Sequence, residues 1–128
     1  MNNNFKVAFA TNDGINTFAH FGRAKYFEVV EIENGNIKSR ERREKPDFHS
    51  NAEHNHQHDH QGHHGRHRTI LELVKDCDFV VAGGMGYGIY DFLVSEGKTP
   101  IVTTVKNIDE ALSLLVENKL ENHIEKLH

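Results

Sequence analysis

Histidine is concentrated in one part of the chain, where its density suits metal binding. Eight of the eleven histidines lie close together: His49, His54, His56, His58, His60, His63, His64 and His67. Neutral imidazole is the commonest protein ligand for late first-row transition metals. The tract from His54 to His67 therefore predicts ligands for nickel, zinc or copper. The alternative is a solvated surface loop whose histidines have no metal role.

The residues around these histidines predict a loop. Apart from Phe48 and Ala52, residues 46–68 contain no clearly apolar side chain. Burial therefore cannot offset the entropy of ordering this stretch. We expect a flexible loop over residues 46–68, with folded sequence on both sides.

A second candidate site is the segment TFAHFGRA, which runs from Thr17 to Ala24. Its histidine, His20, stands between two phenylalanines and before a glycine, in a connection at the end of a predicted strand. Connections at the end of an α/β sheet commonly carry ligands. His20 could ligate a metal or donate to an anion, and Arg23 could hold a negatively charged partner. In the alternative, the phenylalanines are core anchors and His20 only hydrogen-bonds to backbone.

A third candidate is the glycine-rich run GGMGYG at residues 83–88, between a predicted buried strand and a helix. Such turns direct backbone N–H groups and a helix N-terminus toward an anion. The dinucleotide fingerprint GxGxxG is absent, because Ile89 occupies the place of its third glycine, and there is no GxxxxGK[ST] motif. The alternative is a tight turn of small residues. The single cysteine, Cys77, could ligate a soft metal, but a lone cysteine in a buried strand is more often a core residue.

Hydrophobic patterning and turn residues predict the elements that position these candidates. Strands are expected at residues 5–11, 25–32, 37–43, 77–82 and 100–104, with an Asn-Gly hairpin turn at 34–35. Helices are expected from Thr69 with capping-box spacing, from about Ile89 to Glu96 before Gly97, and after the cap Asn107.

This order of elements predicts an α/β fold of the ribonuclease H-like type. The first three strands form an antiparallel meander, and the later strands alternate with helices, which requires right-handed crossovers and parallel pairing. We expect one domain over residues 1–128, built on a mixed five-stranded sheet of order 3-2-1-4-5 with flanking helices. The heavily charged strand at 37–43 suits a sheet edge and disfavours edge-to-edge pairing, so we expect a monomer or weak oligomer.

Composition excludes several classes of protein. The formal net charge is −4 with both signs interspersed, so no basic stripe is available to nucleic acid. No apolar run reaches about 18 residues and the N-terminus lacks a signal-peptide pattern, so we expect no membrane partner and a cytoplasmic protein. One cysteine excludes an intrachain disulfide framework.

Catalytic signatures are also missing from the sequence. No Ser-His-Asp or Cys-His signature is recognisable. A two-metal nuclease needs several converging carboxylates, and the first predicted strand carries none in its middle. We therefore predict a protein that is not an enzyme.

Four blocks occur along the chain in a recognisable order: KVAFATNDG, AHFGRAKYFEVVEIENG, LVKDCDFVVAGGMGYGIYDFLVSEGKTPIVTT and NIDEALSLLVENKL. Together they resemble the dinitrogenase iron–molybdenum cofactor biosynthesis proteins, the group of NifX, the C-terminal part of NifB, and NafY. The resemblance covers roughly residues 5–121 and is interrupted only by the histidine-rich stretch.

The resemblance implies a non-catalytic carrier of an iron–sulfur or iron–molybdenum-type cluster, which receives and delivers the cluster through donor and acceptor proteins. It implies that His20 holds the cluster. The residues expected to surround it are Phe21, Gly22, Arg23, Gly83, Gly84, Met85 and Gly86, whose N–H groups would reach sulfides. Two other functions stay open: a nickel, zinc or copper buffer or metallochaperone using the histidine tract, and a metal-free regulatory module using the face near His20 and Tyr87.

Overall fold

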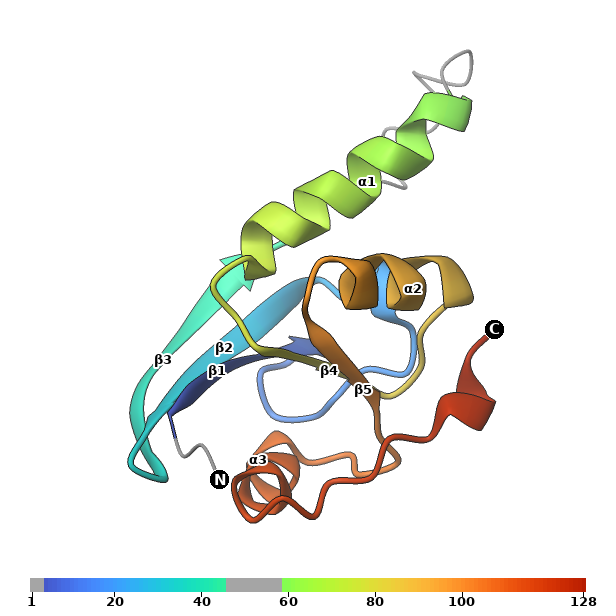
Figure 1. Ribbon diagram of the computed structural model, residues 1–128. Helices are drawn as coiled ribbons and strands as arrows, with labels where there is room; N and C mark the ends of the chain where they lie inside the picture. Colours follow the sequence, from blue (N-terminus) through green and yellow to red (C-terminus); the bar gives the residue numbers. More distant parts are fainter. Residues whose placement is uncertain (1–3, 46–58) are drawn as a thin grey trace.

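The computed structural model describes residues 4–45 and 59–128, with the backbone alone for residues 59–66. Its centre is a five-stranded sheet of order β3-β2-β1-β4-β5 (Figure 1). The strands are β1 (Phe5–Thr11), β2 (Tyr26–Glu33), β3 (Asn36–Glu44), β4 (Phe79–Ala82) and β5 (Thr99–Val102). The β1–β2 and β2–β3 pairs are antiparallel, and the β1–β4 and β4–β5 pairs are parallel. The predicted mixed sheet and its strand order are confirmed.

Three helices cover the two faces of this sheet. They are α1 (Asp59–Val74), α2 (Tyr87–Ser95) and α3 (Ile108–Val116), and short 3₁₀ turns lie at η1 (Phe21–Arg23) and η4 (Ile124–Lys126). Helices α1 and α2 lie on one side of the sheet and α3 on the other (Figure 1). None of the helices described is long and apolar enough to cross a membrane.

The central strands β1 and β4 are buried on both faces. Because strand side chains alternate, Ala8 of β1 joins the core under α1 and α2, whereas Val7 joins the core over α3. Val80 and Val81 of β4 divide between the two cores in the same way. The continuous apolar runs in the sequence therefore belong to strands with helices on both sides.

Turn and cap residues behave as their types predict. Asn34 and Gly35 have φ angles of 55° and 81°, which a type I′ hairpin turn requires. The Asn107 side chain caps α3 by accepting a hydrogen bond from the Glu110 N–H at 2.9 Å. Gly97, with φ of 82°, follows the end of α2. These signals fix the hairpin and the helix ends.

The start of α1 corrects the sequence prediction. The helix begins at Asp59, ten residues before Thr69, so the expected loop over 46–68 is wrong for residues 59–68. Buried Ile70 and Val74 anchor the C-terminal half of α1 to the sheet. Once such an anchored turn exists, each further helical residue adds a hydrogen bond, so a polar stretch can continue the helix. The N-terminal turns of α1 extend beyond α2 (Figure 1).

The C-terminal end of α1 is tied to the sheet by charged side chains. Arg43 of β3 donates to both carboxylate oxygens of Asp76, at 2.7 and 3.0 Å, and to the Leu73 carbonyl at 2.7 Å. The Lys6 ammonium of β1 donates to the same carboxylate at 3.0 Å. These hydrogen bonds, led by those from Arg43, hold the pKa of Asp76 well below its usual range.

Asp76→Asn is expected to lower the free energy of unfolding at pH 7 by about 1 kcal/mol, a modest value because the carboxylate is partly exposed and screened. A carboxyl with a lowered folded-state pKa stabilises the fold above its unfolded pKa and loses this contribution as pH falls. The stability gap between wild type and variant should therefore narrow below the ordinary aspartate range. Urea unfolding at pH 7, 5 and 3 tests this, with exposed Asp91→Asn as control. Equal stability of wild type and Asp76→Asn at pH 7 would contradict it.

Candidate functional site

The loop that follows β1 carries the His20 segment across the carboxyl end of the parallel strands. The Phe18 N–H donates to the Ala10 carbonyl of β1 at 2.9 Å. His20 begins the η1 turn, and its carbonyl accepts from the N–H groups of Arg23 and Ala24 at 3.0 and 3.1 Å. Phe21 is buried in the core under α1 and α2. The phenylalanine thus anchors a turn whose other residues face outward.

The structure brings the His20 segment and the glycine-rich run together. Gly83 donates its N–H to the Phe18 carbonyl at 2.8 Å, and the Phe21 N–H donates to the Gly84 carbonyl at 3.1 Å. A Cβ added at Gly84 would lie 2.1 Å from the carbonyl oxygen of Ala19. Only glycine fits this approach. Two candidate sites that are separate in the sequence therefore form one surface.

Some backbone N–H groups of the glycine-rich run at residues 83–88 are already hydrogen-bonded within the protein. The Gly83 N–H is used by Phe18, and the Tyr87 N–H donates to the His128 carbonyl at 2.9 Å. Met85 is fully buried in the core. Tight packing of small residues therefore explains Gly83 and Gly84. Contact of residues 83–86 with a ligand stays a prediction.

The His20 side chain is exposed and is not used to cap its own turn. Its ring lies edge-on to Phe18, with centroids 5.7 Å apart. Gly22 leaves open space, since a Cβ added there would meet nothing within 4 Å. In residues 4–45 and 67–128, no group of three or more His, Cys, Asp or Glu side chains converges on a metal-ion site, so within these ranges His20 belongs to no such group.

Cationic residues gather at the carboxyl end of the parallel strands, although the whole chain has a net charge of −4. Arg23, Lys25 and Lys106 are all exposed. Lys106 lies beside the His20 loop, because its carbonyl accepts from the Thr17 N–H at 2.6 Å. Asp13, a carboxylate in the same loop, accepts hydrogen bonds from the N–H groups of Asn16 and Ile15, which lower its pKa. Such a distribution favours an anionic ligand.

Lys45, directly after β3, is a feature of this site that sequence reasoning missed. It is 8% exposed, and its ammonium donates to the Phe21 carbonyl. The Nζ atom lies 4.9 Å from the Phe21 ring centroid and 5.6 Å from that of Phe27. Burial lowers the pKa of Lys45 to about 8. The sequence signal for its burial is the alternation of side chains along a strand. Lys45 lies two residues after Arg43 and so shares its face of the sheet, and Arg43 pairs with buried Phe27 of β2.

Lys45→Met is expected to raise the free energy of unfolding at pH 7 by about 2 kcal/mol, because it removes a buried charge and keeps the Phe21 carbonyl paired with the Ala24 N–H. The folded-state pKa is depressed, so the unfolded chain binds more protons between pH 8 and about 10.5. The free energy of unfolding of wild type therefore rises over this pH window, and the difference in stability between Lys45→Met and wild type becomes smaller. Chemical unfolding from pH 7 to 10 tests this. A gap that does not change with pH, while exposed Lys38→Met behaves as wild type, would contradict it.

Cys77 is a core residue, as the lone-cysteine pattern favours. It is 1% exposed. Burial, with a smaller contribution from the Asp76 carboxylate, raises the pKa of the Cys77 thiol to about 12. The thiol is therefore protonated at neutral pH and is a poor metal ligand.

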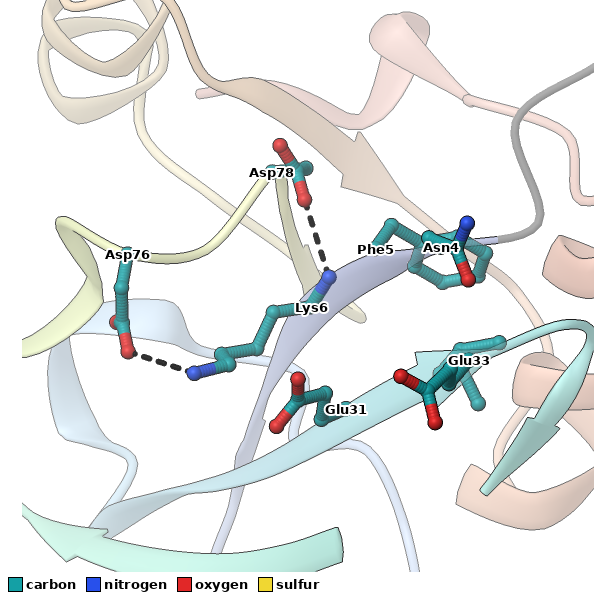
Figure 2. Close-up of a pocket in the computed structure, with 8 residues that line it drawn as sticks. Asn4, Phe5, Lys6, Glu31, Glu33, Asp76 and Asp78 are labelled. Carbon is teal, nitrogen blue, oxygen red and sulfur yellow. Dashed lines mark hydrogen bonds and ion pairs between the residues drawn. The ribbon is translucent and has the colours of Figure 1, made fainter. Parts of the chain in front are cut away.

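The other end of the sheet, where β1 and β4 begin, carries an open pocket of about 260 Å³ (Figure 2). It is lined by Asn4, Phe5, Lys6, Glu31, Ile32, Glu33, Asp76 and Asp78. The backbone N–H of Lys6 donates to Asp78 at 3.0 Å, and its ammonium bonds Asp76 (Figure 2). The carboxylates of Glu31, Glu33, Asp76 and Asp78 make this lining acidic, which disfavours an anionic ligand. The carboxyl end of the parallel strands, where His20 lies, is therefore the better candidate site for an anionic ligand.

Comparisons with known proteins agree with this architecture. Residues 3–118 match the family model described as dinitrogenase iron-molybdenum cofactor. An uncharacterized Methanocaldococcus jannaschii protein is 32% identical over 104 residues, which are 80% of this chain and 78% of that protein.

Solved structures share the fold at low sequence identity. A crystal structure of an M. jannaschii protein whose name refers to dinitrogenase has a TM-score of 0.68 at 17% identity, covering 94% of this chain and 95% of its own. The apo form of the orange protein from Desulfovibrio gigas has a TM-score of 0.66 at 12% identity, covering 92% of each chain. A Thermotoga protein named after NifB has a TM-score of 0.61 at 20% identity, again covering 92% of each chain.

Proposed function

The chain belongs to the dinitrogenase iron–molybdenum cofactor family, and we propose that it is a non-catalytic carrier of an anionic iron–sulfur or iron–molybdenum-type cluster. The observation that carries the proposal is the joined surface at the carboxyl end of the sheet. There the exposed His20 imidazole lies on a turn hydrogen-bonded to Gly83 and Gly84. The residues at this surface bind and release cargo and perform no reaction on it.

The side chains present suit such a cargo. The neutral imidazole of His20 offers a nitrogen ligand to iron or molybdenum. Arg23 and Lys106 supply positive charge toward sulfides and the net negative charge of a cluster. Gly22 lets a bulky ligand approach the backbone, because no neighbouring atom lies within 4 Å of its added Cβ.

Exposure of this surface also favours transfer. A cluster held by one protein side chain keeps other coordination positions open to ligands from a second protein. We expect donor and acceptor proteins to dock over the turn at Phe21–Arg23 and take the cluster directly. Delivery or storage within cofactor biosynthesis is the role that this arrangement supports.

Anaerobic reconstitution of the full chain with ferrous iron and sulfide tests the proposal. We expect iron and acid-labile sulfide to migrate with the protein in gel filtration, and a charge-transfer absorption to appear. Iron retained without sulfide, or neither retained, would contradict a cluster carrier.

A second candidate function, binding of nickel, zinc or copper by the histidine tract, is favoured by the position of α1. Because the helix begins at Asp59, positions 60 and 64 lie about one helical turn apart, and so do positions 63 and 67. Two imidazoles at this spacing form a common bidentate metal site. The predicted ligands His54, His56 and His58 lie outside the described residues.

Calorimetric titration with nickel and zinc chlorides tests this second candidate. The double substitution His60→Gln and His64→Gln should remove the tightest site, whereas His123→Gln should not. His67 is a poorer choice, because its ring packs 5.1 Å from the Phe92 ring between α1 and α2. Binding should weaken below about pH 6 as protons compete for imidazole. Unchanged titration of the double variant would contradict this site.

A further inference from the structure

Lys45 is a buried cation that the carrier function, as described so far, does not use. In residues 4–45 and 67–128 it is the only buried charged side chain. The buried polar side chains in the same ranges are otherwise the threonines Thr11 and Thr103. A buried charge is unfavourable unless something compensates it, so its presence at this position needs a cause.

Compensation inside the described protein is incomplete. The ammonium has one carbonyl acceptor, Phe21, and two aromatic rings, Phe21 and Phe27. The ion pairs formed among the described residues join other side chains, such as Arg40 with Glu28 and Arg43 with Asp76. Burial is the cause that lowers the pKa of Lys45, and no carboxylate of residues 4–45 or 67–128 contributes to it. Within residues 4–45 and 67–128, the positive charge therefore has no ion-pair partner.

The ammonium is fixed with respect to the candidate site. The Lys45 N–H donates to the Lys25 carbonyl at 3.1 Å, which extends the β2–β3 pairing to the end of the His20 loop. The side chain then reaches back to Phe21, the residue that follows His20 in the chain. The cation thus lies beneath the turn, on its buried side, and the imidazole lies on its exposed side.

We propose that Lys45 is a specificity-determining residue: its buried ammonium, held on the Phe21 carbonyl, makes the turn at His20 selective for anionic cargo. The inference rests on the proposed carrier function. Charges interact strongly through the low-dielectric interior, and a preorganised cation does not need to reorganise when the anion arrives. The bound anion supplies a counter-charge that residues 4–45 and 67–128 do not provide.

Two substitutions separate charge from hydrogen bonding. Lys45→Met removes both, whereas Lys45→Gln removes the charge and keeps an N–H donor. Lys38→Met, at an exposed position on β3, is the matched control. After reconstitution with ferrous iron and sulfide at pH 7, both Lys45 variants should show about tenfold weaker retention than wild type. Any cluster that remains should have a lower midpoint potential, because a nearby cation stabilises the reduced, more negative state. A purely structural role of Lys45 does not predict that the midpoint potential falls.

Fold integrity is read from the melting temperatures of the metal-free proteins, which should be at or above that of wild type for Lys45→Met. Wild-type retention and potential in both Lys45 variants would overturn the inference and leave the carrier function standing. Wild-type behaviour of Lys45→Gln alone would also overturn it, since hydrogen bonding would then suffice. If wild type retains neither iron nor sulfide, the carrier function fails and this inference fails with it.

Discussion

Gly84→Ala is expected to lower the free energy of unfolding by about 3 kcal/mol and to abolish cluster retention. The added Cβ would lie 2.1 Å from the Ala19 carbonyl oxygen, so the two backbones must move apart. The hydrogen bonds that join the turns, Gly83 N–H to Phe18 and Phe21 N–H to Gly84, would then lengthen or break. The surface that presents His20 is lost together with stability.

Gly22→Ala is the matched control for this prediction, because it adds the same methyl group to the same turn in open space. Urea unfolding and iron–sulfide retention are measured on both variants. We expect Gly22→Ala to differ from wild type by less than about 1 kcal/mol. Equal effects of the two substitutions would show that the close approach at Gly84 is not what holds the site.

His20→Ala is expected to reduce cluster retention by at least about tenfold without changing the melting temperature, because a ligand is lost from an exposed position. The imidazole does not cap the η1 turn, so its removal leaves the backbone hydrogen bonds from Arg23 and Ala24 in place. His123→Ala, in the segment beside β5, is the control histidine. Full retention by His20→Ala would remove this residue from the site.

Gly84→Ala and His20→Ala separate the residue that binds the cluster from the backbone contacts that position it. Gly84→Ala should change both stability and retention, whereas His20→Ala should change retention alone. The contrast follows from burial: Gly84 lies inside the joint between two loops, and the His20 ring lies outside it. Measuring both quantities on both variants therefore tests the geometry of the site.

The sheet order could be predicted from the sequence because its determinants are local. Asn34 and Gly35 favour a hairpin between two neighbouring strands, and the run that became Phe79–Ala82 is apolar enough to be buried on both faces. The charged third strand is the exposed edge, with Arg43 its one half-buried residue. Short-range patterns of this kind contain the information that pairing requires.

The start of α1 could not be predicted, and the burial of Lys45 was indicated only by strand alternation, because both depend on tertiary context. Residues 59–68 lack the apolar periodicity that identifies a helix, and the anchor that sustains them lies downstream at Ile70 and Val74. Lys45 follows a run of charged residues that are exposed apart from half-buried Arg43, and its burial depends on Phe21 from a loop far away in the sequence. The joint at Gly84 likewise needs Ala19 to be brought beside it.

The central claim is that the folded domain, and not the histidine tract, holds a cluster. The most direct test replaces the tract's histidines by glutamine at 49, 54, 56, 58, 60, 63 and 64, and keeps His67 because its ring packs on Phe92. Deletion of residues 49–67 would instead remove the first turns of α1. Anaerobic loading with iron and sulfide, and separately with nickel and zinc, is then compared with the intact chain. Wild-type retention of iron and sulfide by the variant is the result we predict. Loss of all binding, with a preference of the intact chain for nickel or zinc, would contradict the account.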